Sequence, residues 1–139
     1  MERYMAAMTA FSERSKEEQP EHMGKDSAEC IDWIIDYIYA HNRDFKILIC
    51  CSKGTPYEHF IDSMVEIEVD YTFRYIEALK SLGNEVPEID HDFCHMITNG
   101  MFEGMFEVIR HDMPIDRAKA FIRQLHEFYT AGWLKMMGQ

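Results

Sequence analysis

The closing stretch of the chain, from about Glu88 to Met137, carries two long segments of apolar residues at helical spacing, joined by a short turn at residues 111–114. At 100° per residue, the first segment places apolar side chains on two opposite sides and leaves a narrow polar wedge for water. A helix that is apolar on two sides has to be buried on two sides. One chain can supply one of those partners, so we expect the Asp90–Asp112 helix to pack against a second copy as well.

The second segment, Ile115 to Met137, places its apolar residues in one stripe at i, i+3, i+4 spacing, and Pro114 suits its first turn. Two such hairpins pressed together would form an intermolecular four-helix bundle, which predicts a homodimer. The residues expected at this interface are Gly100, Met101, Gly104, Met105, Val108, Leu125, Phe128, Tyr129, Gly132, Trp133 and Met136. Each interior glycine costs roughly 1 kcal/mol relative to alanine, which suggests close approach of another helix. The alternative is that both helices form the core of a monomer.

Length and composition indicate one globular domain, residues 1–139. A hydrophobic content of 47% excludes disorder, and charges such as Asp32 and Asp36 interrupt the apolar runs, so we expect no membrane association. No apolar signal segment follows Met1, which predicts a cytoplasmic protein. The four cysteines form no CxxC pair and are expected to be reduced thiols.

The formal net charge of −11 argues against direct contact with nucleic acid, because phosphate binding depends on clustered Lys and Arg. Acidic residues concentrate between Asp62 and Asp92. We interpret them as a solvated helix face followed by an acidic loop, with a cation-binding role as the alternative.

The rest of the chain also reads as helical, which predicts an all-α antiparallel bundle of about six helices. We expect helices at residues 2–18, from the Asp26/Glu29 capping signal to about Asn42, and from Thr55-Pro56 to Gly83. A loop is expected at His22–Lys25. The run 45–51 is rich in strand formers but has no second strand to pair with, so we interpret it as a short buried helix.

Chemistry-bearing motifs are sparse. His91 and His95 are four residues apart and flank Cys94, but the Glu that a zinc-protease motif requires after its first His is missing. Glu103 and Glu107 lack the Glu-x-x-His partner of a di-metal bundle. No phosphate-binding loop, nucleophile elbow or Ser/His/Asp grouping is present in the sequence. We therefore expect no enzyme activity, no cofactor and no metal.

Large, adaptable side chains are abundant on the central helices. Any one of them could be ordinary core, but as a set they are typical of an apolar pocket between helices. The residues that we expect to line it are Trp33, Tyr37, Phe60, Met64, Tyr71 and Met96, with Asn99 as a polar contact.

Several segments resemble the C-terminal regulatory domain of TetR-family transcriptional repressors. They are His41–Ile49 (HNRDFKILI), Gly54–Phe60 (GTPYEHF), Gly100–Pro114 (GMFEGMFEVIRHDMP) and Gln124–Trp133. The resemblance runs over almost the whole chain and is most specific in the closing hairpin. It implies a cytoplasmic dimer whose last two helices form the bundle and whose preceding helices bind a small effector.

In that family a separate N-terminal helix-turn-helix domain reads an operator. Its basic helices are absent from these residues, so we expect contact with DNA only through such a missing domain. The resemblance implies that effector binding shifts the DNA-reading heads through the helix that begins at Tyr4, typically with roughly 1–3 kcal/mol of coupling. The alternative function is a helical small-molecule or metal carrier without a regulatory role.

Overall fold

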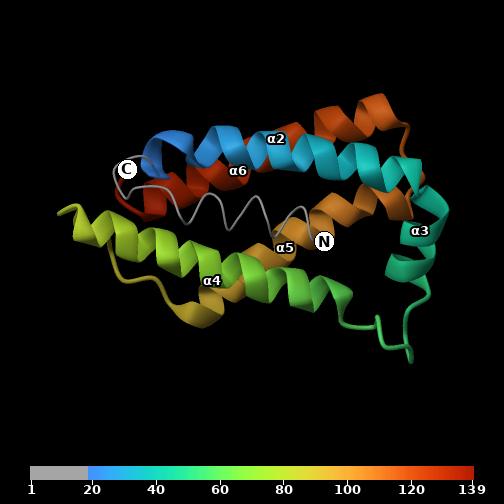
Figure 1. The fold of residues 1–139 in the computed structure, drawn as a ribbon, viewed down its shortest axis with the longest axis horizontal. Helices are drawn as coiled ribbons and strands as arrows, with labels where there is room; N and C mark the ends of the chain where they lie inside the picture. The colour runs from blue at the N-terminus through green and yellow to red at the C-terminus, as the bar shows by residue number, and fades with distance from the viewer. Residues whose placement is uncertain (1–18) are drawn as a thin grey trace.

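The computed structural model describes residues 19–139, with side chains from Glu29 onward except Cys30, and over this range it contains five helices and no strand (Figure 1). The helices are α2 (Gln19–Ala40), α3 (Asn42–Cys50), α4 (Phe60–Ser81), α5 (His91–Arg110) and α6 (Ile115–Met136). The predicted all-α class is thus confirmed over the described range. The helix expected at residues 2–18 lies outside it.

Helix α5 runs through the middle of the bundle. It contacts α3, α4 and α6, while α2 packs along α6, and α3 lies at the end of the bundle where α2 stops (Figure 1). The buried residues of α5 are Cys94, Thr98, Phe102, Met105, Phe106, Val108 and Ile109. Phe106 and Val108 are about 160° apart around the helix, so a single chain buries α5 on two opposite sides. The expectation that one chain could cover only one side was therefore wrong, because α4 and α6 cover different sides.

The predicted hairpin between α5 and α6 is confirmed. Asp90 caps α5 by accepting a hydrogen bond from the Phe93 N–H at 2.9 Å. At its other end Asp112 adopts a positive φ of 50°, and the Met113 N–H donates to the Val108 carbonyl at 2.9 Å. This is the bond pattern that closes a helix end before a turn, and Pro114 then leads directly into α6.

Helix α4 ends where the glycine signal predicted. Gly83 has a φ of +86° and its N–H donates to the Lys80 carbonyl at 3.0 Å, while the Asn84 N–H donates to the Leu79 carbonyl at 3.2 Å. Together these bonds make a Schellman motif, which satisfies carbonyls that the helix end would otherwise leave unpaired.

Two helix starts were predicted wrongly. Over the described residues α2 already includes Gln19, so His22–Lys25 are helical and the Asp26 signal lies inside the helix, because capping-type residues also occur within helices. Helix α4 begins at Phe60 rather than at Thr55. The Thr55 hydroxyl oxygen accepts from the Tyr57 N–H, and the Glu58 carboxylate accepts from the Gly54 N–H, but these bonds close tight turns that precede the helix.

Helix α3 forms as expected but is not a buried helix. None of its residues is fully buried, and Ile47 is 52% exposed. Phe45 and Ile49 pack against the core from one side of the helix, which leaves the other side open. Within the described range, no helix is both long and apolar enough to cross a membrane.

Replacing Gly104 by leucine should destabilise the fold. A Cβ at this position would lie 3.1 Å from Cδ2 of Leu125, so a larger side chain would force α5 and α6 apart. We expect the free energy of unfolding to fall by about 1–3 kcal/mol in urea titrations followed by circular dichroism. Gly132→Ala is the control, because nothing lies within 4 Å of a Cβ at Gly132, and helix propensity should raise stability by up to about 1 kcal/mol. Equal effects of the two changes would contradict this packing.

Candidate functional site

The most conspicuous surface feature of the described chain is an apolar flank of α6. Of the residues in this helix only Ala118 and Ile122 are buried. Phe121, Phe128 and Met136 fall on one side at near-heptad spacing, and Phe128 is 74% exposed. We call Phe121, Leu125, Phe128, Gly132 and Met136 the α6 flank. A side of a helix this apolar is typical of a contact with another molecule.

Two of the three glycines predicted to mark close approach do so within one chain. A Cβ at Gly100 would lie 3.2 Å from the Tyr129 hydroxyl, and one at Gly104 would meet Leu125. These glycines therefore let α6 approach α5 in the same molecule. Gly132 differs, because no atom lies within 4 Å of where its Cβ would be. Of these three glycines, only Gly132, a member of the α6 flank, leaves open space beside it.

The residues predicted for the dimer interface consequently fall into three groups. Met105 and Val108 are buried in the core of the single chain. They were misplaced at the surface because periodicity does not say which neighbour covers a given side of a helix. The half-buried ones are Met101, Gly104, Leu125, Tyr129 and Trp133, and the exposed ones are Gly100, Phe128, Gly132 and Met136.

The residues predicted to line a ligand pocket do not converge on one cavity. Met64 is buried in the core, whereas Met96 is 62% exposed. Tyr71 lies under the Arg74 guanidinium, at 5.2 Å from the ring centroid, and both Tyr71 and Asn99 are half-buried. Their placement shows that helical spacing alone does not identify the helices that surround a shared space.

Trp33, Tyr37 and Phe60 do belong together, in a row of aromatic rings that crosses four helices. Trp33 stacks on Tyr37 with ring centroids 5.3 Å apart. The row continues from Tyr37 to Phe45 at 6.0 Å, from Phe45 to Phe60 at 6.5 Å and from Phe60 to Phe106 at 6.2 Å. We call these five residues the aromatic row. It links α2, α3 and α4 to the central helix α5.

A cavity of about 420 Å³ lies at the end of the bundle, against Phe45 and Phe60 of this row. It is formed by α3, the turns that follow it and the start of α4. The lining residues are Asp44, Phe45, Ile47, Leu48, Cys51, Ser52, Thr55, Tyr57 and Phe60. We call it the α3 cavity. Of the seven predicted pocket residues it contains Phe60, and sequence reasoning missed the rest because it treated 45–51 as buried. The sequence signal that could have located this cavity is the number of aromatic and apolar residues between positions 45 and 60.

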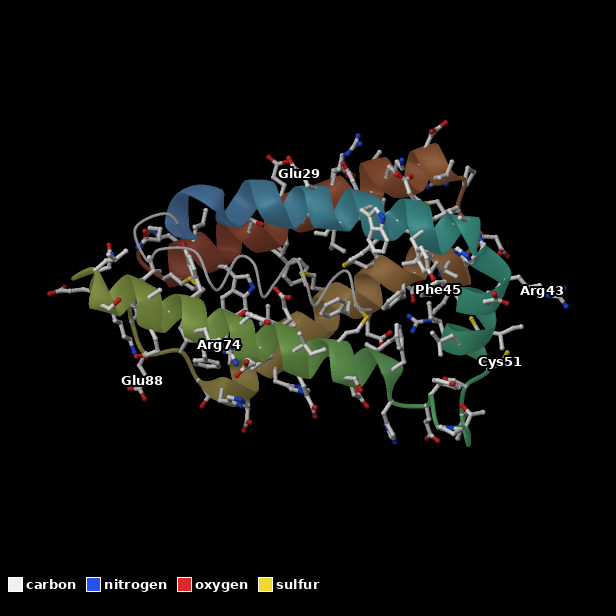
Figure 2. All side chains as sticks on the ribbon, in the orientation of Figure 1. Glu29, Arg43, Phe45, Cys51, Arg74 and Glu88 are labelled. Carbon is white, nitrogen blue, oxygen red and sulfur yellow. The ribbon has the colours of Figure 1, made fainter. Side chains whose placement is uncertain are left out.

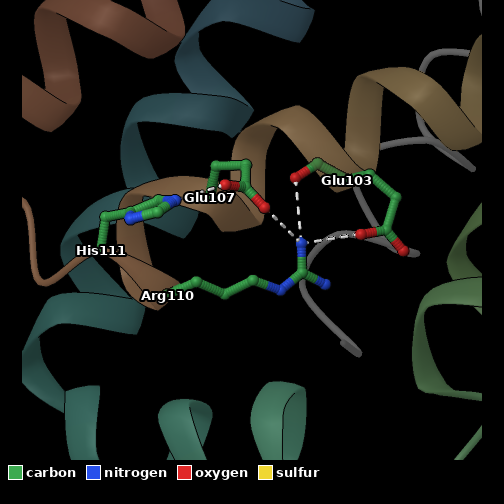
Figure 3. Close-up of polar contacts among 4 residues, drawn as sticks. All are labelled: Glu103, Glu107, Arg110 and His111. Atoms are coloured by element: carbon green, nitrogen blue, oxygen red, sulfur yellow. Dashed lines mark hydrogen bonds and ion pairs between the residues drawn. The ribbon is translucent and has the colours of Figure 1, made fainter.

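The two glutamates of α5 that could have suggested a metal instead bind an arginine (Figure 3). Arg110 Nη1 lies 2.7 Å from the Glu103 carboxylate and 2.9 Å from that of Glu107, and His111 Nε2 lies 2.7 Å from the other Glu107 oxygen. These hydrogen bonds, Arg110 first and His111 second, lower the pKa of Glu107. Burial, the largest single influence, lowers the pKa of Arg110, but its bonds to Glu107 and Glu103 outweigh burial and raise that pKa overall. The network therefore pairs the carboxylates of Glu103 and Glu107 with Arg110, and Glu107 also with His111.

The histidine and cysteine candidates are also dispersed. His91 is exposed and stacks on Phe73 with ring centroids 5.4 Å apart, while His95 is half-buried. Cys94 is buried, and burial raises the pKa of its thiol against the opposing effect of a hydrogen bond with Thr98. Among the described residues, no three His, Cys, Asp or Glu side chains come close enough together to hold a metal ion.

The Glu107 network should make stability depend on acid pH. Because the folded-state pKa of Glu107 is depressed, its stabilising contribution is present above its unfolded value of about 4.3 and is lost as the pH falls through the folded value. We expect Glu107→Gln to lower stability at pH 7 and to flatten its decline below about pH 4.3. In an Arg110→Gln background the same change should have a smaller effect. Parallel pH profiles for wild type and Glu107→Gln in chemical denaturation would contradict this assignment.

Comparison with known protein families, with curated proteins and with solved structures found no match to this chain. What supports a function is therefore the chemistry and geometry of its own residues.

Proposed function

We propose that this chain is the effector-binding and dimerisation domain of a TetR-like transcriptional regulator, and that two copies associate through the α6 flank. The observation that carries the proposal is the exposure of Phe128 in the middle of α6, between Phe121 and Met136 on the same side. DNA would be contacted by a separate basic domain, since a net charge of −11 repels phosphates.

Burial of the α6 flank against a second copy gives a clear energetic gain. Removing apolar surface from water is worth roughly 25 cal/mol per Å², and large aromatic side chains dominate such interfaces. A stripe along one helix can pair with its own copy about a two-fold axis, so the same residues serve both partners. Gly132, one turn after Phe128, has no atom within 4 Å of its Cβ position and so leaves room for a side chain of the partner.

The central helix connects this surface with the α3 cavity. Phe60 lines the cavity and lies against Phe106, a buried residue of α5, and α5 packs along α6. A ligand that moved Phe60 would press on the helix that supports the dimer contact. Such coupling requires different ligand affinities for the two arrangements, typically about 1–3 kcal/mol.

The alternative function, a helical small-molecule carrier, has one observation in its favour. The α3 cavity is built within one chain and does not include α6. A carrier would bind its ligand with the same affinity as a monomer and as a dimer, whereas a regulator would not. The dependence of ligand affinity on association therefore separates the two functions.

Phe128→Glu should convert a dimer into a monomer. The change removes the most exposed aromatic side chain of the flank and would place two charges at the two-fold contact, so we expect the dimer dissociation constant to rise at least about 30-fold, corresponding to about 2 kcal/mol. The measurement is sedimentation equilibrium or light scattering over a dilution series, with circular dichroism to confirm that both proteins fold.

Ile115→Glu is the matched control. Ile115 is also a large exposed apolar residue of α6, but it lies outside the α6 flank and does not line the α3 cavity. The control should remain dimeric. A wild-type protein that is monomeric at micromolar concentration, or a Phe128→Glu protein as dimeric as the control, would refute association through the α6 flank.

A further inference from the structure

We infer that the α3 cavity binds an organic cation with an aromatic or aliphatic body. This rests on the proposed function in that the chain is taken to be a ligand-binding domain. It depends on residues of α3 and the following turns, which are separate from the α6 flank.

The size and position of the cavity suit a small molecule. Its volume of about 420 Å³ falls within the range of roughly 300–1,000 Å³ that is usual for ligand pockets. Figure 2 shows Phe45 and Cys51 on α3 at the end of the bundle, with the Arg43 side chain extending away from it. Three Lys or Arg residues adjoin the lining residues in the sequence, but Arg43 is directed away from the bundle, Lys46 is bound to Asp112, and Lys53 does not line the cavity.

Its walls are apolar and partly uncovered. Phe45 and Phe60 form an edge-to-face pair that closes the inner side, and Leu48 adds aliphatic surface. On the rim, Tyr57 is 65% exposed and Ile47 is more than half exposed. A ligand body placed among them would remove this surface from water, which is the main source of affinity in such pockets.

The lining is almost entirely apolar, and the one charged residue beside it is an exposed acidic residue, which favours a ligand with an apolar body and a cationic end at the rim. Asp44 is the only acidic or basic residue among the lining residues, and within the described part of the chain no Lys, Arg or His pairs with its carboxylate. The nearby Lys46 is held by Asp112 at 2.6 Å and does not line the cavity.

Two further features attract positive charge to this place. The faces of aromatic rings, here Phe45, Tyr57 and Phe60, interact favourably with cations. The net charge of −11 also raises the local concentration of cations around the molecule. An anionic ligand would meet the Asp44 carboxylate, and no basic residue is among the lining residues to offset it.

The test compares three probes that share a naphthalene ring and differ in charge. They are (2-naphthylmethyl)trimethylammonium, 2-naphthalenemethanol and 2-naphthalenesulfonate, titrated into the full chain by calorimetry. We expect the cation to bind about tenfold more tightly than the alcohol, with the sulfonate weakest. Equal affinities for cation and alcohol, or no binding of the cation, would overturn the inference.

Asp44→Asn keeps the shape of the side chain and removes its charge. It should lower the affinity for the cation by about tenfold and leave that for the alcohol unchanged. Asp116→Asn is the matched control, because Asp116 also lies in the first turn of a helix but does not line the cavity. Equal losses in both variants would show that only the general negative field matters and would overturn the site.

Two adjacent thiols report whether the probe occupies this cavity. Cys50 and Cys51 are both exposed, but only Cys51 lines it. The cation should slow N-ethylmaleimide labelling of Cys51 more than that of Cys50, as measured by tandem mass spectrometry. Stronger protection of Cys50 than of Cys51, or no protection of either thiol, would place the probe elsewhere and overturn the inference. A dimer that still dissociates on Phe128→Glu would then leave the proposed association standing.

Discussion

The packing of α5 on every side but one is the constraint on which the rest of the structure depends. Its buried Phe106 lies against Phe60 of α4, and Val108 lies on a different side of the helix. A helix so apolar cannot stand at the edge of a fold, so the other helices are arranged around it. Its remaining surface carries Glu103, Glu107 and Arg110, which satisfy one another rather than requiring an external partner.

Helix α6 is the opposite case, because its apolar residues exceed what α5 and α2 cover. Gly100 and Gly104 bring it close to α5, and this close approach buries Ala118 and Ile122 but turns Phe128 outward. The amphipathic stripe of α6 is thus wider than the contact that its own chain provides. The apolar surface of α6 that its own chain leaves uncovered, rather than the total apolar content of the hairpin, supports association with a second copy.

Sequence patterns located those features that depend on local chemistry. Gly83 and the Asp112–Pro114 turn were placed correctly because a positive φ and a missing N–H leave few alternatives. The signals at Asp26 and Thr55 failed because capping residues also occur within helices and in isolated turns. The pocket was misplaced for a different reason. Helical spacing shows which side of a helix is apolar, but which helices enclose a cavity depends on three-dimensional packing, and Met64 and Met96 consequently have opposite exposures.

The α3 cavity and the α6 flank lie on different helices, yet one physical path joins them. The aromatic row passes from the cavity wall at Phe45 and Phe60 to Phe106, and α5 carries any displacement of Phe106 along its length as a packed helix. Close-packed interiors respond to such displacement by shifting whole elements, because their side chains have little free volume. Since Gly104 allows only a tight contact with Leu125, a small rotation of α5 would alter the position of α6. A ligand at the end of the bundle therefore has a mechanical route to a surface that it does not touch, although the free energy of that coupling has to come from its preference for one arrangement over the other.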